Sequence, residues 1–192
     1  MNQIKTHIKN CALVTLLYVV SYQVVAYVID PLQMYFGTLT FASLVFLPHG
    51  IRVLSAIFYG ARNSFVYIFL ASCLVFLLNG LPARTELTQF LQLLASASCV
   101  PIALVILRFG FGDDHISLSN VGPRTWRSFV VLVIFSSLLN GVMQNLALHF
   151  GGTGINDFSL LITFTIGDVI GAVIVFVIVQ LSLKYFHSKG RR

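Results

Sequence analysis

The sequence predicts an all-α fold, a polytopic transmembrane helix bundle formed by a single domain over residues 1–192. Three observations support this fold class. Hydrophobic residues make up 57% of the chain and charged residues only 9%, whereas a soluble domain is about 25% charged because its surface must stay hydrated. Six apolar stretches follow one another, most of them near the roughly 20 residues that a membrane-spanning helix needs. Basic residues, finally, gather in alternate connections between these stretches.

The predicted spans cover residues 11–29, 33–60, 64–81, 88–107, 128–148 and 158–183. The first span is longer than the about 7–15 residues of a signal-peptide core, and no small-residue cleavage site follows it, so we expect it to be retained. The fourth contains small residues in the run ASASCVP, which favour close helix packing. None of the stretches alternates between polar and apolar residues, and a lipid-facing β-barrel is therefore not expected.

The second span is too long for one upright helix, because it would measure about 42 Å against a hydrocarbon core of about 30 Å. Its middle reads LPHG. Pro48 lacks a backbone N–H and disfavours helix at the residue before it, and Gly50 loosens the following turn. We therefore predict a break near Pro48. Such a break is tolerated inside a membrane only where neighbouring helices or a polar cavity satisfy the freed backbone groups.

The distribution of positive charge predicts the orientation. If the amino terminus is cytoplasmic, then every Lys and Arg except Arg84 and Arg52 falls on the cytoplasmic side of six spans. This bias follows the positive-inside rule. It predicts a multi-pass protein of a bacterial inner membrane with both termini in the cytoplasm.

Three ionisable residues lie within predicted spans. His49 and Arg52 are three residues apart and share a helix face, and Asp168 lies near the middle of the last span. An ionisable group at this depth costs several kcal/mol and normally faces the bundle interior. Arg52 could pair with Asp168 or extend to the headgroups, and Asp168 could serve a ligand or only packing. We predict that His49 and Arg52 face a polar pocket with Asp168 as their counter-charge.

Further polar and small residues accompany this set. Asn140 and Gln144 share one face of the fifth span, where they could form interhelical hydrogen bonds or belong to the same pocket. Gly167 and Gly171 flank Asp168 with the G-x-x-x-G spacing of closely packed membrane helices. The predicted ligand-binding set is thus Pro48, His49, Gly50, Arg52, Asn140, Gln144 and Asp168, with Gly167 and Gly171 in helix packing.

No motif in the sequence indicates catalysis. Metal-ligand spacing such as H-x-x-x-H is absent, no glycine-rich phosphate loop follows a strand, and no serine stands in a recognisable nucleophile motif. We therefore expect neither an enzyme nor a metal site, and no cofactor is indicated. The net charge of +6 is explained by topology, and no basic and aromatic cluster suggests a nucleic-acid partner.

Two stretches together resemble a known family. FLPHGIRVLSAIFYGAR resembles the W-P-x-x-G segment of the membrane-associated sensor (MASE-type) domains of bacterial signalling proteins, although Phe46 and Leu47 stand where a tryptophan is usual. FTIGDVIGAVIVF resembles the G-D-x-x-G segment in a late helix of the same domains. The resemblance implies a stand-alone, shortened sensor-like bundle whose pocket involves Pro48, Gly50 and Asp168.

The size and basic character of the chain are also similar to those of the substrate-binding subunits of energy-coupling-factor vitamin transporters, although the first span lacks their A-x-x-x-A docking motif. We therefore expect a small-ligand-sensing or partner-binding membrane module, with a transporter subunit as the alternative. The expected partners are the lipid bilayer and a larger membrane protein complex or further copies of the chain.

Overall fold

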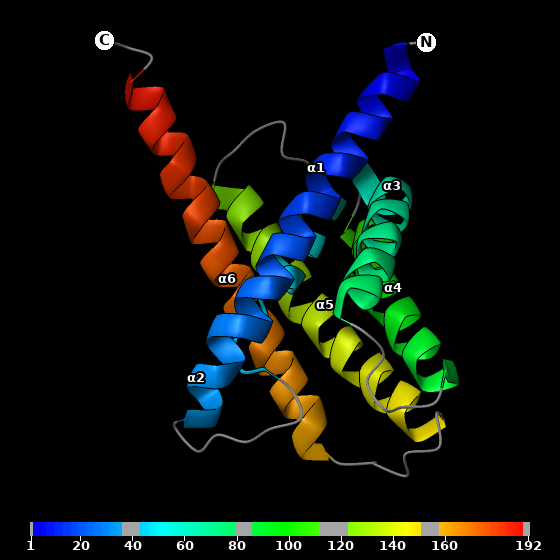
Figure 1. Ribbon diagram of the computed structural model, residues 1–192. Coiled ribbons are helices and arrows are strands. Elements are labelled where there is room, and N and C mark those ends of the chain that lie inside the picture. The colour runs from blue at the N-terminus through cyan, green and yellow to red at the C-terminus, as the bar shows by residue number, and fades with distance from the viewer. Residues whose placement is uncertain (1, 36–42, 80–85, 112–122, 151–157, 190–192) are drawn as a thin grey trace.

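The computed structural model describes residues 2–35, 43–79, 86–111, 123–150 and 158–189 (Figure 1). These ranges contain helices and no strand, and five helical segments are long and apolar enough to cross a membrane. The fold is therefore an all-α bundle of membrane-spanning type, in which the six predicted spans are not confirmed as six separate helices. The helical elements are α1 (Asn2–Val24), η1 (Val25–Ile29), α2 (Asp30–Tyr35), α3 (Leu47–Asn79), α4 (Glu86–Phe111), α5 (Pro123–Leu148) and α6 (Phe158–Lys189).

The first helix is longer than predicted. Helix α1 continues through the π-helical turn η1 into α2, so residues 30–32, which separate the first two predicted spans, are helical. Pro31 cannot donate the backbone hydrogen bond of a regular helix, and its ring crowds the preceding turn. The wider π turn just before it accommodates this, with the N–H of Asp30 bonded to the carbonyl of Val25. Gln33 consequently lies in α2, near the end of the first helix, instead of beginning the second span.

The break in the second predicted span lies just before Pro48. Residues 43–46 are not helical, and α3 begins at Leu47 with Pro48 in its first turn. A proline is well tolerated there, because the first N–H groups of a helix have no partner within it. Pro48 therefore starts a helix and does not kink one, which corrects the predicted mechanism of the break. Residues 36–42 of the predicted span lie outside the described ranges.

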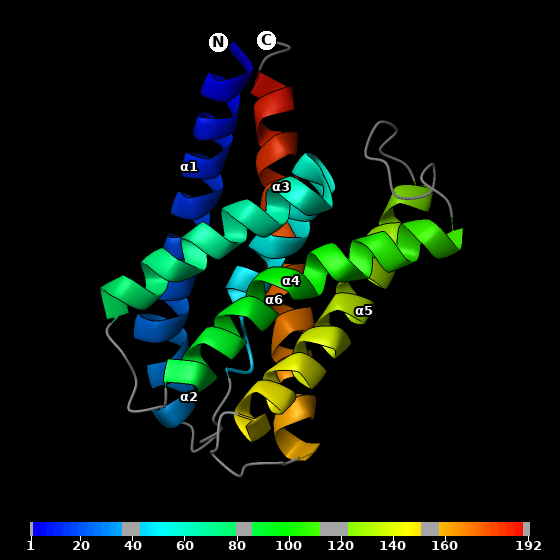
Figure 2. The ribbon, with the colours of Figure 1, turned by 90° about the vertical axis from the view of Figure 1, so that its right-hand side faces the viewer.

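Helix α3 covers parts of two predicted spans and bends sharply at Gly60, where φ is 79° and ψ is 166°. This backbone conformation is essentially restricted to glycine. The bend separates a first arm, residues 47–59, from a second arm, residues 61–79, and Figure 2 shows the two arms diverging from it. A single residue thus makes the reversal for which the sequence predicted a separate connection.

The glycines around Asp168 pack against the non-helical residues 43–46 and not against a second helix. A Cβ atom at Gly167 would overlap the carbonyl oxygen of Ser43, and one at Gly171 would overlap that of Phe46. The N–H of Phe46 also donates to the carbonyl of Gly167 over 2.9 Å. This bond satisfies a backbone group that the break before α3 would otherwise leave unpaired inside the membrane. The two glycines therefore approach residues 43–46 closely, and not the second helix that their spacing predicted.

Gly50 supports the same crossing from the other side. A Cβ atom there would lie 2.6 Å from Cβ of Val175 and 3.1 Å from Cα of Ala172, both in α6. The first arm of α3 therefore lies directly on α6. Small residues at such crossings are the usual means by which membrane helices approach each other.

The start of α1 and the end of α6 lie at the same end of the bundle, here called the terminal end (Figures 1 and 2). Helix α3 packs against α1, α4 and α6, and α5 packs against α4 and α6. The main core joins the first arm of α3 to α4, α5 and α6, through Val53, Ala56, Cys99, Val100, Ala103, Leu104, Leu107, Phe129, Leu132, Val133 and Ala172. Large apolar side chains of every long helix are exposed on the outside, as expected of a lipid-facing surface.

Candidate functional site

A polar cavity of about 390 Å³ lies within the bundle. This volume is in the range of about 300–1,000 Å³ that is typical of small-molecule pockets. All the long helices contribute to it, together with Ser43 and Phe46, which precede α3. Its walls are formed by Tyr18, Tyr22, Val25, Ala26, Asp30, Ser43, Phe46, Arg52, Ser72, Val75, Phe76, Asn79, Gln89, Gln92, Leu93, Ser96, Asn140, Gln144, Phe164 and Asp168.

The cavity is closed toward the terminal end by the core. Along α4 the cavity-lining Ser96 is followed by the buried Val100 and Leu104, and along α6 the lining Asp168 is followed by the buried Ala172. Helix α5 runs the opposite way and shows the reverse order, with core Leu132 before the lining Asn140. On each of these helices, the core residues therefore lie nearer to the terminal end than the cavity-lining residues do.

The other end of the cavity is built from helix ends. Asp30 lies in α2, Asn79 is the last residue of α3, and Gln89 is in the first turn of α4. Helix α2 and the start of α4 lie away from the terminal end (Figures 1 and 2). The cavity is therefore blind, with its floor near the middle of the bundle.

Arg52 forms part of the floor and is only 2% exposed. Its Nη2 donates to the hydroxyl of Tyr18 over 2.9 Å, and its guanidinium carbon lies 5.6 Å from the centre of that ring and 5.2 Å from the centre of the Phe46 ring. Cation–π contacts of this kind orient a guanidinium as well as stabilise it. Arg52 is thus held inside the bundle and does not extend to the membrane surface.

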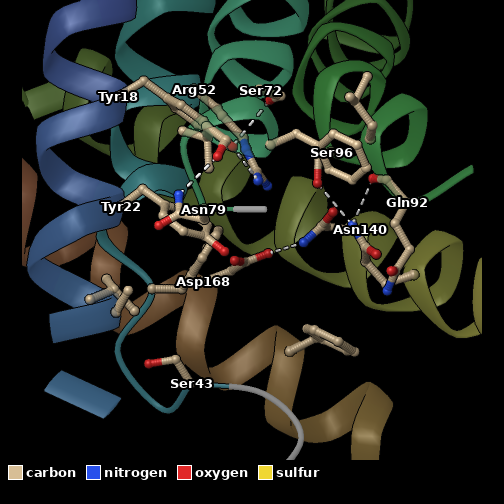
Figure 3. A pocket seen from close by; sticks show the side chains of 18 of the residues that line it. Tyr18, Tyr22, Ser43, Arg52, Ser72, Asn79, Gln92, Ser96, Asn140 and Asp168 are labelled. Atoms are coloured by element: carbon tan, nitrogen blue, oxygen red, sulfur yellow. Dashed lines mark hydrogen bonds between the residues drawn. The ribbon is translucent and has the colours of Figure 1, made fainter. Parts of the chain in front are cut away.

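Asp168 is bound by neighbours other than Arg52. Its Oδ2 accepts a hydrogen bond from Nδ2 of Asn140 over 2.6 Å and lies 3.3 Å from Nδ1 of His49. Among the described residues, no ion pair within 4.0 Å joins Asp168 to Arg52. Figure 3 shows the two side chains facing the same open space from different helices. The predicted direct pairing is therefore replaced by a shared cavity, with His49 as the direct partner of the acid.

His49 connects three helices behind the cavity wall. Its Nε2 lies 3.1 Å from Oγ of Ser136 and 3.3 Å from Oγ of Ser137, while its Nδ1 faces Asp168. This order of serine, histidine and aspartate matches that of a hydrolase triad. Both serines and His49 are completely buried, however, and none of the three lines the cavity. A substrate in the cavity would not reach the serine oxygens, and the arrangement accordingly acts as a packing network between α3, α5 and α6.

Gln144 joins α5 to α4 at the cavity wall. Its Nε2 donates to Oγ of Ser96 over 2.9 Å and to the carbonyl of Gln92 over 3.2 Å. Interhelical bonds of this kind are one of the two roles predicted for the Asn140 and Gln144 pair, and both residues also line the cavity. The two predicted roles thus coincide.

Of the predicted ligand-binding residues, the structure brings Arg52, Asn140, Gln144 and Asp168 to the cavity. His49 stands one side chain behind it, whereas Pro48 and Gly50 only shape the start and the packing of α3. That any of these residues binds a ligand stays a prediction.

Sequence reasoning missed the contributions of α1 and α4. A signal for both was present, because Tyr18 and Tyr22 are four residues apart. Gln89, Gln92 and Ser96 likewise follow one another at helical spacing on an otherwise apolar helix.

Comparison of the chain with protein-family models, with curated proteins and with solved structures finds no match. The resemblances to membrane-associated sensor domains and to vitamin-transporter subunits therefore remain hypotheses, which rest on the short motifs and the general character of the sequence.

Proposed function

We propose that this chain is an inner-membrane module that binds a small polar ligand inside its helix bundle, in order to sense the ligand or to present it to a partner. The observation that carries the proposal is the blind cavity with a buried guanidinium and a buried carboxylate in its walls. Buried ionisable groups in a membrane are costly and mark functional sites by default. A role in packing alone would not require Arg52 and Asp168 to line a polar cavity.

The same arrangement is compatible with a channel-like path only if the core on the terminal side opens. Val53, Ala56, Val100 and Leu104 are completely buried there. A binding module needs no such opening, whereas a transporter subunit does. We therefore keep the substrate-binding subunit of a small-molecule transporter as the second candidate, supported by the polar residues that line the cavity on the side away from the core.

A ligand screen tests the binding function. The full chain, reconstituted in lipid nanodiscs, is heated with separate pools of amino acids, carboxylic acids, sugars and polyols, and nucleosides. At least one pool is expected to raise the unfolding temperature with increasing concentration, because a ligand that binds only the folded state stabilises it. Ala26→Phe fills the cavity wall and should abolish the shift, while Ala12→Phe, at an exposed position of the same helix, should keep it. A shift that persists in Ala26→Phe, or no shift with any pool, would contradict the proposal.

Co-purification and transport assays separate the two candidates. A sensing or assembly module should be recovered in mild detergent with a larger membrane protein or as a homo-oligomer. A transporter subunit should let its ligand enter proteoliposomes that contain this chain and an energising partner. Uptake of the ligand would favour the alternative.

Orientation is part of the proposal, because the positive-inside rule places the terminal end in the cytoplasm and the cavity entrance on the outer side. In a chain without its native cysteines, Ser72→Cys should react with a membrane-impermeant thiol reagent added to spheroplasts, since Ser72 lines the cavity. A chain that keeps only Cys73, the next residue, provides the control, because Cys73 does not line the cavity. Reaction of Ser72→Cys only in inverted vesicles would reverse the orientation. The connection that holds Arg84 lies outside the described ranges.

A further inference from the structure

We infer that the cavity binds a small zwitterion that carries a carboxylate and a protonated amine, as an amino acid does. This inference rests on the proposed ligand-binding function and names the class of the ligand. It follows from two sets of polar groups of opposite character on residues that line the cavity.

The first set is on Arg52. Tyr18 satisfies Nη2, but Nε and Nη1 have no hydrogen-bond partner in the described part of the chain. A charged donor that is buried without an acceptor is strongly unfavourable. Phe46 and Tyr18 hold the guanidinium in place, so it cannot turn toward another acceptor without losing its cation–π contacts. A carboxylate is the acceptor that best matches the free N–H groups of a guanidinium.

The second set is on Asn140 and Asp168. The amide nitrogen of Asn140 donates to Asp168, which leaves Oδ1 of Asn140 buried with no donor among the described residues. The carboxylate of Asp168 stands beside it in the cavity wall. An amide oxygen next to a carboxylate calls for a positively charged group with several N–H donors, and a protonated amine has three.

The balance of charge excludes simpler ligands. An anion alone would satisfy Arg52 but would enter a cavity that also contains Asp168 and Asp30. A cation alone would satisfy Asp168 and leave the guanidinium without an acceptor. A neutral sugar would offer hydroxyl groups to both ends but would compensate neither charge. A zwitterion satisfies both ends at once and adds no net charge to the interior of the membrane.

Analogues distinguish the ligand classes on the unaltered chain. Nanodiscs that contain the full chain are first tested with a pool of proteinogenic L-amino acids, and the most stabilising member is then compared with three derivatives. These are the acid without its amine, the amine without its carboxylate, and the amide of the same amino acid. We expect the intact amino acid to bind at least about tenfold more tightly than each derivative, since each one lacks a charge-assisted hydrogen bond.

The outcomes separate this inference from the proposed function. Equal binding of the acid without its amine would overturn the zwitterion and leave an anion site. Stabilisation by sugars or nucleosides, with none by amino acids, would overturn the inference while the ligand-binding function stands. No stabilisation by any pool would overturn both.

A variant tests the role of Arg52 directly. Arg52→Lys keeps the charge but loses the planar guanidinium with its several fixed donors, and we expect at least about a tenfold weaker affinity for the selected amino acid. Arg62→Gln, an exposed arginine of the same helix that does not line the cavity, is the matched control and should leave the affinity unchanged. Undiminished affinity in a folded Arg52→Lys variant would show that the carboxylate binds elsewhere.

Discussion

Replacing both Gly167 and Gly171 with alanine is expected to prevent stable folding of the chain. Each new methyl group would overlap a backbone carbonyl oxygen, that of Ser43 or that of Phe46, just before α3. Overpacking of this kind typically costs about 1–3 kcal/mol for each substitution, and here backbone would have to move. Such a movement would also break the hydrogen bond from Phe46 to Gly167 and displace His49 from Asp168.

The unfolding free energy in detergent and the yield of monodisperse protein provide the measurements. Gly110→Ala is the matched control, because no atom lies within 4 Å of the added methyl group and Gly110 is exposed near the end of α4. Alanine there should be neutral or should stabilise the helix by about 0.5–1 kcal/mol. If the double alanine variant were as stable as the Gly110→Ala variant, residues 43–46 would not pack on α6 as described.

Asp168→Asn is expected to lower the unfolding free energy by about 3–5 kcal/mol, the typical cost of leaving a buried charge without its counter-charge. The charge left behind is that of Arg52, which faces Asp168 across the cavity (Figure 3). Arg52→Gln should cost a similar amount for the reciprocal reason. Ser182→Ala, on the exposed end of α6, should change stability by less than about 0.5 kcal/mol.

The double variant Asp168→Asn with Arg52→Gln should recover part of these losses, because no uncompensated charge remains. Strictly additive losses would mean that the two charges do not interact through the cavity. The hydrogen bond from Arg52 to Tyr18 and the contact of His49 with Asp168 would then account for each loss separately.

The all-α, membrane-spanning class of the fold was predictable because it depends on composition and on the length of the apolar stretches. The interruption near Pro48 was predictable because a proline lacks the backbone N–H and disfavours helix at the residue before it. Arg52 and Asp168 could be singled out because charges are rare in lipid and each must have a partner. These inferences need only local sequence and the properties of the bilayer.

Only the tertiary structure decided which partners these groups have. The spacing of Gly167 and Gly171 indicates that another segment approaches closely. It does not indicate that this segment is residues 43–46, just before α3. The depth of Asp168 indicates a partner, but His49 and Asn140 are nearest to it because α3 begins on α6 and α5 lies alongside. The cavity itself depends on the bend at Gly60, since the second arm of α3 brings Ser72 and Asn79 to its wall. Contacts between distant segments are set by packing, and packing is not encoded in any one of the segments that it joins.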